Sequence, residues 1–435
     1  MTTTPAETHA SPPRRAGRLA AHDRPTPLAA VLAFVFFNSL SSGVGTTAFA
    51  FVAESAFGFG PTENYALGLV QGVTYIVGAL AVGPVMRRLL ARLAWLTGRG
   101  VLAGLLVALG AGCAMPLTVR GLTGGEGGAW TIWVLIGLYS LLTGVLWPLC
   151  ESFLSGGRSG RRLVSAVGLF NIAWSSALVV TFWIIGPLVS RYPLEVVAGS
   201  GVIHVLSGAL LPLFNRDPGH HGAHVHTPHP PVYRDLLRLM RIELPASYLV
   251  YSALGPYLPA ALEGMGVAEN WRTPIVATWL ATRVITFAVL ERWHGWHGTW
   301  SSPIVGGVLL LAGFALTLLS PALLAPGAAL PALVVGLGVF GVGMGTIYSA
   351  AIYYAMEVGA AEVEAGGTHE ALIGLGYGGG PICGLFAAGL VRAGVIEARL
   401  LPVTVVIAVA VVTTPVIGYA IVRAHARRRN GVERH

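Results

Sequence analysis

The sequence has no lysine, few charges and only three cysteines, and each shortage excludes a class of protein. Charged residues make up 11% of its 435 residues, against about 25% in soluble domains, so a water-exposed globular protein is excluded. The cysteines lie in separate apolar stretches, which argues against a disulfide framework and a cysteine-based metal site. Apolar sequence is abundant instead: 54% of the residues are hydrophobic and the mean hydropathy is +0.70. These values predict a protein that crosses a membrane many times.

Twelve apolar runs are long enough to cross a bilayer as helices, which takes about 20 residues. They cover 28–52, 65–86, 98–117, 130–154, 163–189, 196–214, 243–262, 272–292, 303–320, 331–356, 370–391 and 400–423. Runs of this length exclude the short alternating strands of a membrane barrel, so the predicted fold class is all-α and polytopic, with twelve transmembrane helices. We expect two six-helix bundles at 28–214 and 243–423, tails at 1–27 and 424–435, and a His-rich linker at 215–242.

The arginines predict how the helices are oriented. Of the 27 arginines, 21 fall in the tails and in the loops on the same side, 5 fall in the opposite loops, and Arg283 lies within a span. Because cytoplasmic loops are enriched in basic residues, we expect both termini in the cytoplasm. The clusters lie between apolar runs, so nucleic acid is not an expected partner. The absence of lysine, with abundant arginine, alanine and glycine, suggests a GC-rich bacterium and hence its cytoplasmic (inner) membrane.

The two halves of the sequence share a repeat. The run Gly144–Trp147 is followed after 27 residues by Trp174, and the run Gly345–Tyr348 is followed after 29 residues by Tyr377. Because six spans intervene, the matching helices cross in the same direction. This predicts a parallel pseudo-repeat about an axis normal to the membrane.

Twelve spans in two halves, with a cytoplasmic linker and cytoplasmic termini, resemble the major facilitator superfamily of secondary transporters. The family's loop motif, Gly-x-x-x-Asp-Arg-x-Gly-Arg-Arg, can be aligned with 83–92, where Gly83, Arg88 and Arg92 match and Arg87 replaces the aspartate. The family's antiporter pattern, Gly-x-x-x-Gly-Pro-x-x-Gly, is absent from the fifth span. It appears in the eleventh span as Gly376, Gly380, Pro381 and Gly384, and we interpret it there as an element for packing and bending.

The resemblance implies an arrangement of the spans. Spans 1, 4, 7 and 10 would line a central cavity, spans 2, 5, 8 and 11 would close it, and spans 3, 6, 9 and 12 would face lipid. Alternating access would then require small residues where helices slide or bend. The gating candidates are Gly255, Pro256, Gly376, Gly380 and Pro381, for which ordinary close packing of membrane helices is the alternative interpretation.

Charges inside a membrane are costly, so each one is a functional candidate. Arg283 lies near the middle of the eighth span, and we expect it either to bind substrate or to form a structural pair between helices 5 and 8. Glu151, near the cytoplasmic end of the fourth span, is the candidate for proton coupling. The alternative for Glu151 is an interfacial acid bonded to the arginines of the following loop. Glu54 and Glu263 end spans 1 and 7, either as an outer gate or as solvated helix ends.

Polar and aromatic side chains on the inward spans provide further candidates for solute binding, since ligand sites are mostly apolar with a few placed polar groups. These are Asn38, Trp147, Asn171, Trp174, Tyr251, Tyr348 and Tyr377. His204 is interpreted as a satisfied packing histidine. The linker histidines at 220–229 have metal-like spacing, but the prolines among them argue against a compact site, so no metal is predicted. The amphipathic segment 233–241 is expected to lie on the cytoplasmic leaflet.

These features predict a membrane transporter rather than an enzyme. The sequence contains no phosphate-binding P-loop and no hydrolase or metalloprotease pattern, and no cofactor is expected. The hypothesis is alternating-access transport of a small organic solute, coupled to protons and performed by a monomer in the lipid bilayer. The alternative is a sensor or scaffold on the same fold that transports nothing, because a fold does not determine function.

Overall fold

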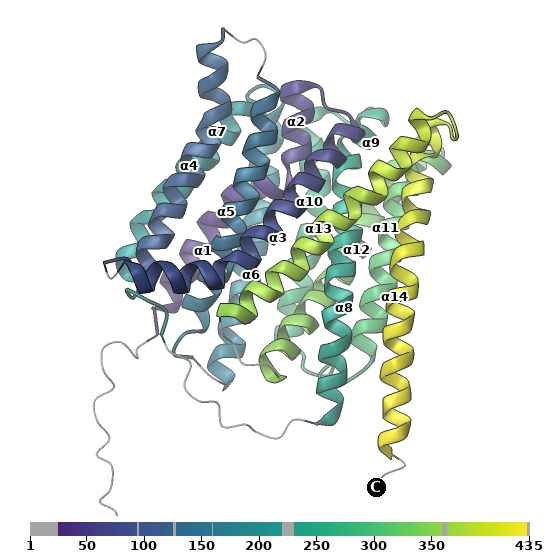
Figure 1. Ribbon diagram of the computed structural model, residues 1–435. Coiled ribbons are helices and arrows are strands. Elements are labelled where there is room, and N and C mark those ends of the chain that lie inside the picture. The colour runs from purple at the N-terminus through teal and green to yellow at the C-terminus, as the bar shows by residue number, and fades with distance from the viewer. Residues whose placement is uncertain are drawn as a thin grey trace, which may run out of the picture.

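The computed structural model describes residues 25–93, 95–124, 128–158, 160–219, 230–358 and 363–432. Within these ranges the chain is helical and contains no strand, which confirms the all-α fold class (Figure 1). Long helices are what an apolar chain adopts in lipid, because each backbone amide and carbonyl is then paired within its own segment.

The first half of the chain contains the first six spans in order. Its elements are α1 (Leu28–Ser42), the π-helical turn η2 (Gly43–Thr47), α2 (Phe49–Phe57), α3 (Pro61–Arg92), α4 (Gly98–Leu122), α5 (Trp130–Ser155), α6 (Gly160–Val189), α7 (Pro193–Ser207) and the 3₁₀ turn η3 (Gly208–Leu213). The first span is therefore interrupted where glycine-rich sequence allows a wider turn. At Gly45 a β-carbon would lie 2.6 Å from the ring of Tyr139, so the backbone can approach α5 only without a side chain.

The second half contains the other six spans. Its elements are α8 (Pro231–Leu254), the 3₁₀ turn η4 (Gly255–Tyr257), α9 (Leu258–Gly264), α10 (Glu269–Arg292), α11 (Ser301–Leu323), α12 (Pro326–Val358), α13 (Val363–Arg392), the 3₁₀ turn η5 (Ala398–Leu400) and α14 (Leu401–Val432). Eleven of the described helical segments are long and apolar enough to cross a membrane. The expected seventh span is α8, η4 and α9 together, and with it the predicted twelve are present.

The segment 233–241 differs from its prediction. It is not a separate surface helix, because it forms the first turns of α8 and continues directly into the seventh span. The reason is its apolar face: Leu236, Leu237, Leu239 and Met240 are all buried in the protein. Pro231 at the first turn has a fixed backbone angle that suits a helix start, so the helix begins before the apolar span does.

The two halves meet mainly through two helix pairs, α3 with α13 and α6 with α10, which are spans 2 with 11 and 5 with 8. Small residues permit the first contact. At Gly72 of α3 a β-carbon would lie 2.3 Å from the backbone nitrogen of Gly378 on α13, so the two backbones touch. Close approach of this kind is typical of membrane helices, which associate without a hydrophobic driving force.

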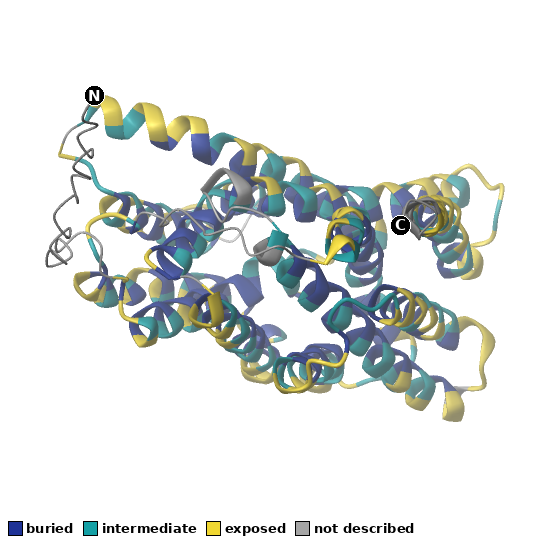
Figure 2. Ribbon diagram, turned by 90° about the horizontal axis from the view of Figure 1, so that it is seen from below, coloured by how far each residue is buried: buried dark blue, intermediate teal, exposed yellow. Residues whose placement is uncertain are grey.

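Helix α1 begins and helix α14 ends at the same end of the bundle, which we name the terminal face; the other end is the opposite face (Figures 1 and 2). Near the terminal face, the Arg158 guanidinium donates hydrogen bonds to the carbonyl of Thr26 and, at 2.6 Å, to that of Leu154. The proposed linker at 215–242 is described only in part, and the histidine cluster 220–229 lies outside the described residues.

Candidate functional site

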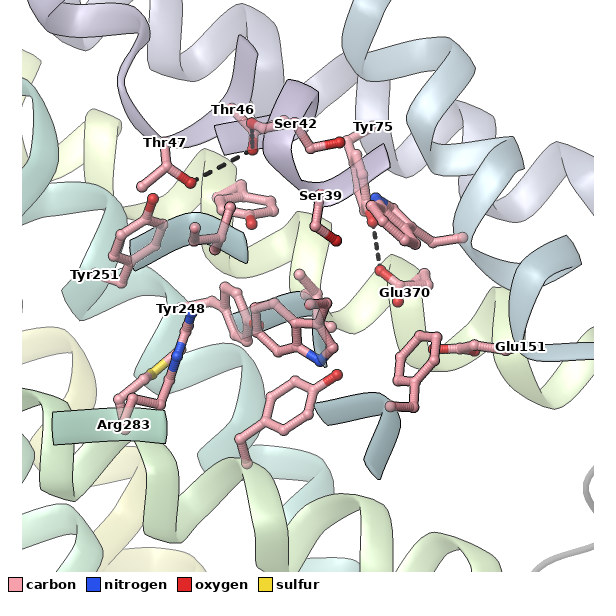
Figure 3. Close-up of a pocket in the computed structure, with 18 of the residues that line it drawn as sticks. Ser39, Ser42, Thr46, Thr47, Tyr75, Glu151, Tyr248, Tyr251, Arg283 and Glu370 are labelled. Atoms are coloured by element: carbon pink, nitrogen blue, oxygen red, sulfur yellow. Dashed lines mark hydrogen bonds between the residues drawn. The ribbon is translucent and has the colours of Figure 1, made fainter. Parts of the chain in front are cut away.

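A cavity with an empty volume of about 690 Å³ lies between the two halves of the molecule (Figure 3). Its lining comes from α1 with η2, α3, α5 and α6 in the first half and from α8, α10, α12 and α13 in the second. Within the described part of the chain, α4, α7, α11 and α14 contribute no lining residue. These four are spans 3, 6, 9 and 12, the ones that the resemblance places toward lipid.

Arg283 provides a buried positive charge on one wall of the cavity (Figure 3). Its side chain belongs to α10 and is 2% exposed. The Nε atom donates a hydrogen bond to Ser175 Oγ at 3.0 Å, whereas Nη2 has no hydrogen-bond partner among the described residues. No ion pair found within those residues involves Arg283. A buried charge is costly unless paired, so this guanidinium has unused capacity to bind an anion.

Two tryptophans hold the Arg283 guanidinium. Its central carbon lies 4.4 Å from the ring centre of Trp174 on α6 and 4.6 Å from that of Trp279, one turn earlier on α10. Such cation–π contacts contribute about 0.5–2 kcal/mol each. Trp174 is oriented in turn by Asn171, whose Oδ1 accepts a hydrogen bond from the indole nitrogen at 3.1 Å. Because two rings contact the guanidinium, the N–H groups on its edge are those best placed to meet a ligand.

Tyrosines cover much of the remaining wall. Tyr248 and Tyr251 lie on one face of α8, and Tyr377 approaches both from α13, with ring centres 5.2 Å and 5.9 Å away. Tyr348 of α12 contacts Trp174 edge to face at 5.5 Å. The wall therefore combines flat apolar faces with hydroxyl groups, which suits a small solute that has both a ring and polar substituents.

Two carboxyl groups occupy the side of the cavity away from Arg283 (Figure 3). Glu151 comes from α5 in the first half and Glu370 from α13 in the second, and both line the cavity. Tyr75 of α3 donates a hydrogen bond to Glu370 Oε2. Two ionised carboxylates that share a buried site repel one another, which favours a proton on one of them. The pair is therefore a chemically suitable place to hold and release a proton.

The alternative interpretation of Glu151 pairs it with the arginines of the following loop, and the structure describes the contacts of one of these, Arg158. Arg158 donates to backbone carbonyls, those of Phe153, Leu154 and Thr26, and no ion pair described in the structure joins it to Glu151. Glu151 instead faces the cavity and Glu370.

Most of the predicted solute-binding residues line this cavity. They are Arg283, Trp147, Trp174, Tyr251, Tyr348 and Tyr377, and the proton-coupling candidate Glu151 lines it as well. Asn171 lines a neighbouring cavity toward the terminal face. Sequence reasoning did not single out several lining residues, namely Ser39, Ser42, Thr46, Thr47, Tyr75, Phe170, Leu178, Tyr248, Trp279, Met344, Glu370 and Ile373. Trp279 could have been found from its spacing of one helical turn before Arg283.

Asn38 lies away from the cavity, in a buried polar network of the first half. Its Oδ1 is 2.8 Å from His204 Nδ1, and its Nδ2 donates to Ser207 Oγ at 2.9 Å. The other ring nitrogen of His204 is 2.8 Å from the Tyr139 hydroxyl. Both nitrogens of this fully buried imidazole are thus engaged, which is the arrangement expected of a packing histidine. The network joins α1, α5 and α7.

The gating candidates lie at close helix contacts and at a helix break. On α13, a β-carbon at Gly376 would lie 2.4 Å from the Tyr248 β-carbon, and one at Gly380 would lie 2.3 Å from the Leu249 carbonyl oxygen. Both glycines thus let α13 touch α8. Gly255 and Pro256 form η4, the 3₁₀ turn between α8 and α9. Pro381 contacts the first half, because a β-carbon at Gly68 of α3 would lie 2.9 Å from its ring.

The two halves are also joined near the opposite face. Tyr65 donates from its hydroxyl to the Ala253 carbonyl at 3.0 Å, and Arg272 Nη1 lies 3.5 Å from Glu54 Oε2. Burial raises the pKa of Glu54 to about 7, and the nearby Glu263 carboxylate also raises it, whereas Arg272 lowers it. Glu54 therefore changes its charge near neutral pH at a contact between the halves.

Comparison with known proteins identifies the fold. No protein-family profile matches the chain, and no curated protein matches it by sequence. Among solved structures, the nucleoside transporter NupG aligns with 92% of this chain and 98% of its own, at 12% identity and a TM-score of 0.60. A bacterial homologue of the human lysosomal transporter Spinster, inward-facing and unoccupied, aligns with 94% of this chain and 96% of its own, at 11% identity and a TM-score of 0.60. Both neighbours are transporters of the major facilitator superfamily, so the chain has that superfamily's fold.

Proposed function

We propose that this multi-pass membrane protein is a secondary transporter that moves a small organic solute by alternating access. The observation that carries the proposal is the cavity between the halves, with Arg283 on one wall and the Glu151–Glu370 pair on the other. Residues from both halves line this cavity, so rocking of one half against the other would expose it to each face in turn. The solved neighbours with this fold are transporters, a class that is not enzymatic.

The solute that fits best is an organic anion or zwitterion with a flat ring. Arg283 offers N–H groups to a carboxylate or phosphate, and the tyrosine and tryptophan faces offer stacking surfaces. A positively charged group on the same solute would find the carboxyl pair across the cavity. NupG is a nucleoside transporter, and a heterocyclic base is one example of such a ring.

Proton coupling is proposed through Glu151 and Glu370. When the pair holds one proton, a hydrogen bond between the two carboxyl groups would join α5 to α13 and so the two halves. When the proton leaves, two negative charges face each other; at 4 Å and an effective dielectric constant of 20, their repulsion is about 4 kcal/mol. Loss of the proton would thus favour separation of α5 from α13, and a positively charged group would favour their approach. The same groups would then link the proton gradient to the movement of the halves.

The proposal also includes the membrane that holds the protein, the side on which its termini lie, and its oligomeric state. The excess of arginines in the tails and in the loops on the same side in sequence supports a cytoplasmic position for both termini, and the composition supports a bacterial inner membrane. The solute cavity is complete within one chain, which supports a functional monomer.

Reconstitution tests the proposal. Purified protein in proteoliposomes, under an imposed pH gradient, should take up or release solutes that a thermal-shift screen of metabolites identifies as ligands. Wild-type transport should depend on the gradient and be lost in Arg283→Gln. If ligands bind but never cross the membrane in either direction, the transporter proposal fails and a sensor on the same fold takes its place.

A further inference from the structure

A second large cavity lies on the lipid-facing side of the first half, away from the solute cavity. Its empty volume, open side included, is about 880 Å³, and it is bordered by α1 with η2, by α6 and by α7. The lining is almost entirely aliphatic: Leu40, Val44, Ile184, Ile185, Leu188, Val196 and Ile203, with Thr181, Ser200 and Gly199. We name this cavity the α6–α7 groove. Tyr192 and Glu195 line its end at the opposite face.

The groove is open to the bilayer. Ile184 is 52% exposed and Leu188 40%, although both lie in the last two turns of the membrane-spanning helix α6, and Tyr192, between α6 and α7, is 53% exposed. In lipid such surface is covered by hydrocarbon rather than by water. Gly199 contributes to this opening, because a β-carbon placed there would meet no atom within 4 Å.

The length of the groove matches one leaflet. From Tyr192 to Ile203 the lining follows α7 for eleven residues, which is about 16 Å at the helical rise of 1.5 Å per residue. Half of a hydrocarbon core of about 30 Å is about 15 Å. A single acyl chain of the leaflet at the opposite face therefore fits the groove from end to end, with its headgroup beside Tyr192, in the region that interfacial aromatics occupy.

The polar end of the groove favours a particular headgroup. Glu195 is exposed there, and no ion pair among the described residues involves it. A carboxylate in this position attracts a headgroup with an ammonium group and repels one with a net negative charge. Arg191, four residues earlier and also exposed, is available to the lipid phosphate.

We propose that the α6–α7 groove is a binding site for one acyl chain of a phospholipid with a primary-amine headgroup. The occupant would contact the first span at its interruption. Thr181, in the groove, donates to the Leu40 carbonyl at 2.9 Å, and it packs against Gly43, the first residue of η2. Thr46 and Thr47, at the end of the same turn, line the solute cavity.

Photo-crosslinking in proteoliposomes tests the site. Phosphatidylethanolamine with a diazirine in one acyl chain is incorporated into the bilayer, and the adducts are mapped by mass spectrometry. We expect adducts concentrated on residues 184–203. Gly199→Phe fills the groove and should reduce these adducts at least fivefold. The matched control is Gly104→Phe on α4, where a β-carbon also meets no atom within 4 Å, and it should leave them unchanged.

The headgroup is tested by competition. Unlabelled phosphatidylethanolamine should displace the adducts more effectively than phosphatidylglycerol, and Glu195→Gln should remove this difference. Adducts spread over all lipid-facing helices, unchanged by Gly199→Phe, would overturn the site; equal competition in wild type would overturn its headgroup preference. If Gly199→Phe does not fold, the wild-type adduct map decides alone.

Discussion

Replacement of Arg283 by glutamine is the sharpest test of the solute site. Glutamine keeps a hydrogen-bonding group near Ser175 but removes the positive charge and the fork of N–H donors. The Nη2 atom has no partner among the described residues, so the substitution leaves no protein acceptor newly unpaired there. A loss of affinity would therefore report on the ligand.

The expected loss of ligand affinity follows from the hydrogen bond between the solute and the Arg283 guanidinium that the substitution removes. A hydrogen bond to a charged group contributes about 1.5–3 kcal/mol, which corresponds to about a 10- to 150-fold loss in affinity. The free energy of unfolding of the protein without ligand should change less than the ligand affinity. The cation–π contacts with Trp174 and Trp279 are lost, about 0.5–2 kcal/mol each, but so is the cost of burying an unpaired charge.

Ligand-induced thermal stabilisation measures this difference. At a ligand concentration one hundred times the wild-type dissociation constant, binding stabilises the folded protein by about 2.7 kcal/mol. A variant that binds a hundredfold more weakly gains only about 0.4 kcal/mol under the same conditions. Neutral analogues of the same ligand should stabilise both proteins equally.

The control is Arg272→Gln, the same substitution on the same helix but near the opposite face. It should leave ligand affinity unchanged. If anionic ligands stabilise Arg283→Gln as much as wild type, or if Arg272→Gln lowers affinity equally, then Arg283 does not bind the solute and the reasoning from its free N–H groups is wrong.

Three further predictions concern proton coupling through Glu370, the titration of Glu54 near the opposite face, and the contact between α3 and α13. Glu370→Gln should abolish the dependence of net transport on the pH gradient while leaving solute exchange measurable, because Glu151 then has a neutral partner; unchanged gradient dependence would exclude the pair from coupling. Burial raises the pKa of Glu54 to about 7 from 4.5, so the folded state retains a proton that the unfolded state releases, and its stabilising effect is lost as the pH rises through this window. The midpoint of thermal unfolding should therefore fall between pH 4.5 and 7 more in wild type than in Glu54→Gln, and equal slopes would contradict the assignment. Gly72→Val should separate α3 from α13 and stop transport, because its side chain would meet the backbone of Gly378; normal uptake would show that the helices do not need this contact.

Apolar runs alone sufficed to predict the number and order of the spans. Unpaired backbone groups are costly in lipid, and a helix pairs all of these groups within its own segment. The same physics identified Arg283, since a charge at the middle of a span is costly wherever it points. The 3.6-residue period did not reveal where the seventh span begins. The charged start of α8 resembles a surface segment in sequence, and only its buried leucines show that it packs into the bundle.

Only the tertiary structure decided which polar groups meet. Glu370 stands at the predicted edge of a span, where its sequence resembles an acidic loop, yet it lines the same cavity as Glu151, 219 residues away. Asn38 and Tyr348 looked equally suited to a cavity, but Asn38 turns to His204 while Tyr348 faces the cavity. A helix exposes side chains in every direction, and the rotation of each helix is set by its packing against neighbours far away in the chain. Local sequence does not contain that information.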